Sequence, residues 1–170
     1  MKRIFFAALA VLSTVTALAS DATSGVEQRV QSILAKMTLE EKIDLLGGVN
    51  GFDVRGVPRL GVPMMATADG PFGVRRYSRS NVMAGGMILA ATWNTELAQS
   101  VGREIGRDAR ARGVHFYLAP GVNIYRSPLN GRNFEYMGED PFLASQMAVN
   151  VIKGVQGQGV AATIKHYLGN

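Results

Sequence analysis

The sequence contains no cysteine, only two histidines and a single tryptophan. Without thiols the chain can form no disulfide, no thiol nucleophile and no zinc–cysteine site, so its fold must depend on the burial of apolar groups. No cluster of metal-ligating residues is evident, and we expect no metal ion.

The chain also lacks a concentrated patch of positive charge. Lysine and arginine outnumber acidic residues 18 to 13, but they are scattered, with the densest groups at residues 75–79 and 107–112. Proteins that bind nucleic acid usually gather this charge into a stripe or patch. We therefore expect no nucleic-acid partner and interpret these arginines as solvated surface and helix-end charges.

The one long apolar run, at residues 4–19, is too short for a membrane anchor, which needs roughly 20 apolar residues. It follows the basic start Met1-Lys2-Arg3 and ends in Ala17-Leu18-Ala19, the A-x-A pattern of a signal-peptidase site. We expect residues 1–19 to be a signal peptide, cleaved after Ala19. The mature protein, residues 20–170, would then be periplasmic or secreted, with no membrane association.

Helical and strand patterns alternate in the mature part. Apolar residues recur at helical spacing over 26–37, and Thr38-Leu39-Glu40-Glu41 is a capping box for a second short helix that ends at Gly47. A loop rich in glycine and proline follows up to Pro63. Further along, we expect strands at 64–68, 114–119 and 159–164, a helix capped by Asn94 that ends at Gly113, and a helix at 142–155.

This order of elements predicts an α/β fold with a parallel sheet, whose strand ends carry the functional site. Polar residues lie at those ends: Asp69 after the first strand, residues 123–132 after the second, and Lys165 and His166 after the third. Adjacent side chains in a straight strand point to opposite faces, so Lys165 and His166 share a site only if the backbone bends there. The pattern alone leaves open a closed barrel or an open sheet.

Short motifs follow one another along the mature chain. They are MTLEEKI at 37–43, RLGVP at 59–63, DGPFGVR at 69–75, AATWN at 90–94, APGVNI at 119–124, RSP at 126–128, GRNFE at 131–135, EDP at 139–141 and KH at 165–166. Together they resemble glycoside hydrolase family 3, the β-glucosidase-like family.

The resemblance implies a (β/α)8 TIM-barrel-like domain, of which residues 20–170 would be the N-terminal part with roughly the first three βα units. It implies a retaining, exo-acting β-glycosidase that hydrolyses terminal non-reducing β-linked sugars and needs no cofactor. The family's nucleophile lies on a later strand and its acid/base on a following domain. We therefore expect no catalytic residue in this fragment, no activity of the fragment alone, and poor folding of three unaccompanied βα units.

By resemblance, the residues that bind substrate are Asp69, Arg132, Lys165 and His166. Fixed donors and acceptors with charge suit the hydroxyls of a sugar. Two of these residues also have a structural interpretation: Asp69 is a turn residue in Asp-Gly-Pro, and Arg132 forms a salt bridge with Glu135 or Glu139. We expect the loop carboxylates Glu135, Glu139 and Asp140 to pair with Arg126 or Arg132 rather than to act in catalysis.

Three other residues were considered for the site. We expect His115 to be structural, Trp93 to pack between a helix and the barrel, and Arg75 to be only a candidate for contact with the sugar. Tyr167 to Asn170 after the Lys-His pair fits the glucosidase and xylosidase branch better than the N-acetylglucosaminidase branch, which has K-H-F-P-G. The alternatives are a non-catalytic exported sugar-binding protein or inactive remnant, and an exported α/β domain without a sugar site.

Overall fold

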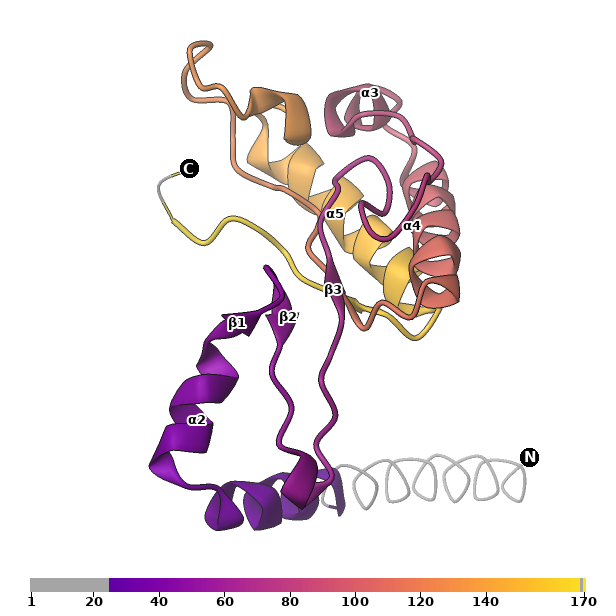
Figure 1. Ribbon diagram of the computed structural model, residues 1–170. Helices are drawn as coiled ribbons and strands as arrows, with labels where there is room; N and C mark the ends of the chain where they lie inside the picture. Colours follow the sequence, from indigo (N-terminus) through magenta and orange to yellow (C-terminus); the bar gives the residue numbers. More distant parts are fainter. Residues whose placement is uncertain (1–24, 169) are drawn as a thin grey trace, which may run out of the picture.

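The structure is a computed structural model that describes residues 25–168 and residue 170 (Figure 1). The expected signal peptide lies outside the described residues. Within the described part, no helix is both long and apolar enough to cross a bilayer.

The described part of the chain starts with two helices and a small hairpin. Residues 25–36 are helical, and α2 spans Leu39–Leu46. The expected capping box is present, since the backbone N–H of Glu41 donates to Thr38 Oγ1 at 3.2 Å and the N–H of Thr38 donates back to Glu41 Oε2 at 3.0 Å. The side chains of Thr38 and Glu41 therefore satisfy two backbone N–H groups at the N-terminus of α2.

An antiparallel hairpin occupies part of the segment where we expected only loop. Strands β1, Gly48–Val49, and β2, Asp53–Val54, pair across a turn in which Asn50 and Gly51 have positive φ values of 52° and 95°. Asn-Gly is a strong hairpin signal because both residues adopt this left-handed conformation readily. A short 3-10 helix, η1, Pro58–Leu60, follows.

The hairpin is attached to the rest of the protein through a buried ion pair. Asp53, which is 1% exposed, accepts from Arg76 Nη2 at 2.8 Å and from the backbone N–H of Thr67 at 2.9 Å. The expectation that Arg76 is a solvated surface charge was wrong, because its side chain is only 15% exposed. Arg112 is also structural, since it donates to the backbone carbonyls of Arg76 and Arg79.

The three expected parallel strands are present. Strands β3, Thr67–Ala68, β4, Phe116–Tyr117, and β5, Ala161–Ala162, form a parallel sheet in the order β3-β4-β5. Each is shorter than its apolar run, but backbone hydrogen bonds continue beyond the strands. Lys165 N donates to Pro120 O at 3.0 Å, and Val122 N donates to Lys165 O at 2.8 Å. The segments that follow β4 and β5 therefore remain side by side.

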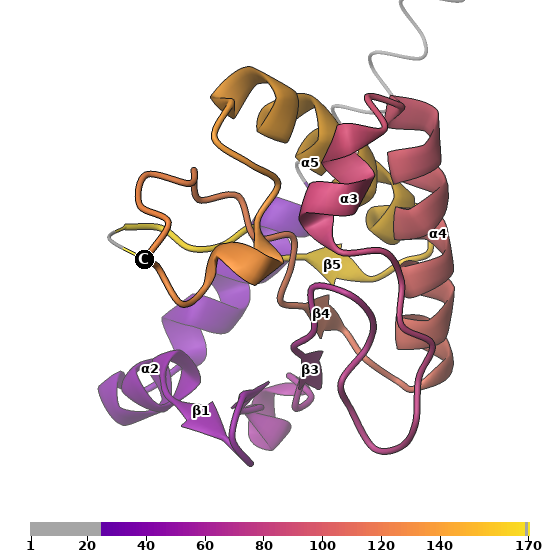
Figure 2. The same ribbon diagram turned by 90° about the horizontal axis from the view of Figure 1, so that it is seen from above.

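Helices cover one side of this sheet (Figure 2). Helix α4, Thr95–Ala111, is capped by Asn94, whose side chain accepts from Leu97 N at 2.9 Å, and α5 spans Pro141–Gln156. The two helices pack against each other, whereas α2 and the hairpin lie on the other side. Buried apolar residues from the helices, strands and intervening loops form one core. Its largest fully buried members include Tyr117, Met147, Val74, Val155 and Val160.

Two expectations about the helix ends were wrong. Asp140 does not pair with an arginine, because it caps α5: Oδ1 accepts from Phe142 N at 2.8 Å, just ahead of the proline at the first helical position. Trp93 follows the short helix α3, Gly86–Ala91, which we did not expect, and its side chain is 75% exposed rather than packed.

Glycines allow α4 and α5 to approach closely. A Cβ built on Gly154 would lie 2.3 Å from the carbonyl oxygen of Gln99, and one built on Gly102 would lie 2.3 Å from that of Val151. Both contacts are with backbone, so the helices would have to separate to accept a methyl group.

We expect Gly154→Ala to lower the free energy of unfolding of the full-length protein by about 1–3 kcal/mol, the usual cost of overpacking a core. Chemical denaturation measures this change. Gly131→Ala is the matched control, because a Cβ at Gly131 meets no atom within 4 Å. Equal denaturation midpoints for Gly154→Ala and the wild type would show that the helices separate at no cost.

Candidate functional site

The four residues that sequence reasoning selected for substrate binding meet at the carboxyl end of the sheet. Asp69 directly follows β3, and Lys165 lies three residues beyond β5. Lys165 Nζ donates to Asp69 Oδ1 at 2.6 Å, although 96 residues separate the two in sequence. Because parallel strands end on the same edge, these side chains are brought together by the sheet itself.

Arg132 joins the cluster from the loop between β4 and α5. Its Nε forms an ion pair with Glu135 Oε1, and Glu135 Oε2 lies 3.4 Å from Lys165 Nζ. Arg132 Nη2 lies 2.9 Å from His166 Nε2. The salt bridge that we considered for Arg132 is thus confirmed with Glu135, and the same guanidinium also reaches a second site residue.

The contacts of His166 determine which ring nitrogen carries its proton. Arg132 can only donate, so His166 Nε2 must accept, and the proton of the neutral ring is then on Nδ1. That nitrogen lies 3.0 Å from the Tyr136 hydroxyl and 3.3 Å from Asn123 Oδ1. Asn123 Oδ1 also accepts from the backbone N–H of His166 at 2.7 Å. Asn170 Nδ2 lies 2.6 Å from the same ring nitrogen, so an Nδ1–H finds an acceptor there only if this amide is turned to bring its oxygen to that position.

The surroundings shift the pKa values of the site residues. Burial raises the pKa of the Asp69 carboxyl, but hydrogen bonds from Lys165 and the backbone of Gly70 outweigh it, so the net pKa is below the usual value. Burial, with the nearby Arg132 charge, lowers the pKa of His166. At neutral pH the site therefore contains a charged carboxylate, which can accept further hydrogen bonds, and a neutral imidazole, whose acceptor nitrogen faces Arg132.

Exposure increases from the centre of the cluster to its edge. The exposed fraction of the side chain is 2% for Glu135, 14% for Lys165, 28% for Asp69 and 44% for Arg132. Asp69 also lines an open pocket of about 530 Å³, together with Phe52, Arg75, Tyr77 and other residues. The outer groups can thus exchange water for the hydroxyls of a ligand, whereas Glu135 cannot.

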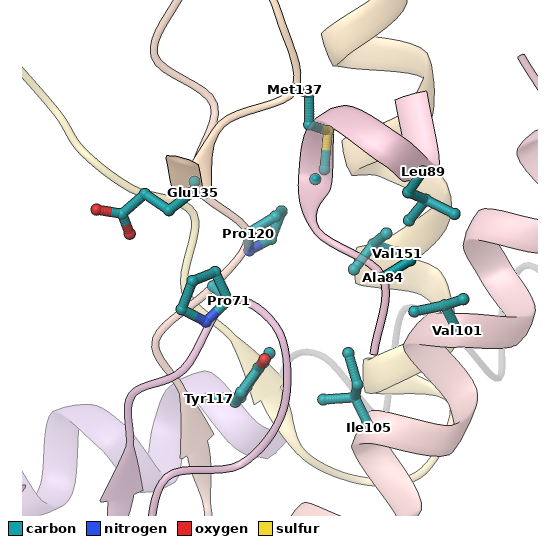
Figure 3. Close-up of a pocket in the computed structure, with 13 residues that line it drawn as sticks. Pro71, Ala84, Leu89, Val101, Ile105, Tyr117, Pro120, Glu135, Met137 and Val151 are labelled. Carbon is teal, nitrogen blue, oxygen red and sulfur yellow. The ribbon is translucent and has the colours of Figure 1, made fainter. Parts of the chain in front are cut away.

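A separate cavity lies behind the site, between the sheet and the helices (Figure 3). Pro71, Tyr117 and Pro120 form one wall, and apolar side chains of α3, α4 and α5 form the other. Its volume of about 20 Å³ is room for about one water molecule. It is therefore a packing defect rather than a place for a sugar, and the carboxylate of Glu135 points away from it.

The other sequence candidates fall outside the central cluster. His115 Nδ1 accepts from the backbone N–H of Ala66 at 3.0 Å, which ties the segment before β3 to β4, as expected for a structural residue. Arg75 lies 3.8 Å from Asp69 Oδ2 with its side chain 74% exposed. In the described part of the chain, no group of three or more histidine, aspartate or glutamate residues is placed to hold a metal ion.

Two partners of His166 received no individual role from sequence reasoning. Asn123 was one of several polar residues in the loop after β4, and its position in that loop was the available signal. Tyr136 directly follows the GRNFE segment, and no periodicity or spacing distinguishes it. Their proximity to His166 becomes visible only once β4 and β5 are paired.

Comparisons with known proteins show which family the chain resembles. Residues 13–170 match the family described as the glycosyl hydrolase family 3 N-terminal domain. A β-glucosidase of Bacteroides ovatus is 48% identical over 160 residues, which cover 86% of this chain and 21% of that relative. Thermostable β-glucosidase B of Acetivibrio thermocellus is 41% identical, with 83% of this chain and 20% of the relative covered.

A solved structure has the same fold in this region. β-Glucosidase 3B from Thermotoga neapolitana, in complex with glucose, superposes with a TM-score of 0.76 at 42% identity, over 84% of this chain and 23% of that one. The chain spans about a fifth of the length of the curated relatives that it matches. Since the family match covers most of the sequence and the relatives are well above 30% identity, the chain belongs to glycosyl hydrolase family 3, within its N-terminal domain.

Proposed function

We propose that the full-length protein is an exported β-glucosidase-like enzyme, and that Asp69, Arg132, Lys165 and His166 bind the sugar whose glycosidic bond is cleaved. The observation that carries this proposal is the convergence of these four side chains at one edge of the sheet. The relatives give the substrate class its support, because those with 41% to 48% identity are named β-glucosidases.

The chemistry of the cluster suits recognition better than bond cleavage. Asp69 offers a charged acceptor, Arg132 offers a planar set of donors, and charge-assisted hydrogen bonds are about twice as strong as neutral ones. Retaining hydrolysis needs two carboxyl groups about 5–5.5 Å apart, one as nucleophile and one as acid/base. The carboxylates of Asp69 and Glu135 both form ion pairs with Lys165, so neither is free to act as nucleophile or acid/base. We therefore assign the nucleophile and the acid/base to other parts of the full-length enzyme.

The same proposal includes the architecture and the destination of the protein. Strands β3, β4 and β5, with α4 and α5 on one side, fit the first three units of a (β/α)8 barrel. Residues 1–19 fit a signal peptide that directs the protein to the periplasm or the medium.

Expression of the complete reading frame tests the activity. We expect hydrolysis of p-nitrophenyl β-D-glucoside, no hydrolysis of the α-anomer, and release of β-glucose first, as proton NMR would show for a retaining enzyme. Saturable glucose binding by calorimetry without turnover would instead support the non-catalytic sugar-binding alternative. If the protein neither binds glucose nor hydrolyses the glucoside, the proposed sugar site is refuted.

A further inference from the structure

Glu135 is a buried acid among the sugar-binding residues, although its side chain is almost inaccessible. It ends the 3-10 helix η2, Asn133–Glu135, and its side chain is 2% exposed. A buried carboxylate is expensive unless other charges and hydrogen bonds satisfy it. Its partners therefore indicate what it does.

Both partners of Glu135 are cations of the proposed sugar site. Oε1 pairs with Arg132 Nε, and Oε2 lies 3.4 Å from Lys165 Nζ. Figure 3 shows the carboxylate directed away from the apolar cavity that Glu135 borders. The four ionic groups alternate in sign from Asp69 through Lys165 and Glu135 to Arg132, so their charges balance.

Glu135 occupies only part of the hydrogen-bond donors of its two partners. Arg132 is held through Nε, its Nη2 lies 2.9 Å from His166 Nε2, and its Nη1 has no hydrogen-bond partner among the described residues. Lys165 divides its ammonium protons between Asp69 at 2.6 Å and Glu135 at 3.4 Å, which leaves one of its three donors for a ligand.

We propose that Glu135 is a positioning residue of the sugar site, which holds Arg132 and Lys165 with their free donors directed toward the substrate. This inference rests on the proposed function of the same site. Arginine and lysine side chains lose much rotamer freedom when they bind a ligand, and a buried carboxylate that fixes them beforehand removes that cost from sugar binding.

The test uses Glu135→Gln in the full-length protein, a change that keeps the shape of the side chain and removes its charge. We expect KM for p-nitrophenyl β-D-glucoside to rise about tenfold while kcat changes less than about threefold, because ground-state and transition-state contacts of Arg132 and Lys165 weaken together. Glu135→Asp, which keeps the charge on a shorter stem, should recover part of the loss. Glu139→Gln, an exposed charge in the same loop, should leave both constants unchanged.

A double-variant cycle separates positioning from a general structural role. In an Arg132→Gln background, Glu135→Gln should raise KM by about threefold or less, because one of its two targets is gone. Equal effects in both backgrounds would overturn the proposal.

A crystal structure of Glu135→Gln gives a readout that does not depend on activity. The Arg132 guanidinium should leave His166 Nε2, its neighbour at 2.9 Å in the wild type. If Arg132 and Lys165 keep their positions, Glu135 does not position them. A wild-type protein that fails to hydrolyse β-glucosides would refute the proposed function, whereas the crystal structure would still decide the role of Glu135.

Discussion

Asp69→Asn in the full-length protein is expected to lower kcat/KM for p-nitrophenyl β-D-glucoside by about 100- to 1000-fold. Asp69 directly follows β3, its side chain is 28% exposed, and its Oδ1 accepts a 2.6 Å hydrogen bond from Lys165 Nζ. A hydrogen bond to a charged group is worth about 1.5–3 kcal/mol, and the change weakens two or more: the bond to Lys165 and those to sugar hydroxyls. A loss of about 3–4 kcal/mol in the transition state corresponds to this range of rates.

Steady-state kinetics measures the effect, and thermal unfolding shows whether the variant is folded. Asp44→Asn is the control, since it removes an exposed carboxylate from α2 and should leave kcat/KM unchanged. A fall of less than tenfold for Asp69→Asn would favour the structural interpretation of Asp69 as a turn residue in Asp-Gly-Pro.

The elements that sequence reasoning located correctly are those with strong local signals. Helix α4 has a regular apolar stripe and an asparagine cap, and the capping box at Thr38 operates as the pattern predicts. The hairpin of β1 and β2 was missed because its strands are only two residues long and lie in a segment dense in glycine and proline. The Asn50-Gly51 turn was a usable signal there.

Charged residues were harder to place, because their partners are distant in the sequence. Arg76 was assigned to the surface, yet it pairs with Asp53, which lies 23 positions away on another element. Asp140 was assigned to an ion pair through its motif, although an aspartate directly before Pro141 is a local helix-start signal. The convergence of Asp69 with Lys165 was predictable because both follow parallel strands, whereas the contact of Tyr136 with His166 depends on how a loop folds back.

The second large effect concerns stability: Asp53→Asn is expected to lower the free energy of unfolding of the full-length protein by about 3–5 kcal/mol. The variant leaves the guanidinium of Arg76, 15% exposed, without its charged partner and loosens the hairpin from β3. Denaturant unfolding measures the change. The double variant Asp53→Asn/Arg76→Gln is the matched control, because removing both charges avoids an unpaired buried charge and should recover a large part of the loss.

The same pair makes stability depend on pH in a defined direction. Hydrogen bonds from Arg76 hold the pKa of Asp53 below its ordinary value, which is about 3.9 in an unfolded chain. A carboxyl whose pKa is depressed by folding stabilises the folded state fully above the unfolded value, and this contribution is lost as the pH falls through the folded one. The difference in unfolding free energy between the wild type and Asp53→Asn should therefore be constant near neutral pH and shrink below about pH 4. A difference that stayed constant into strong acid would mean that the ionised state of Asp53 does not stabilise the fold, and that the buried contact acts through packing alone.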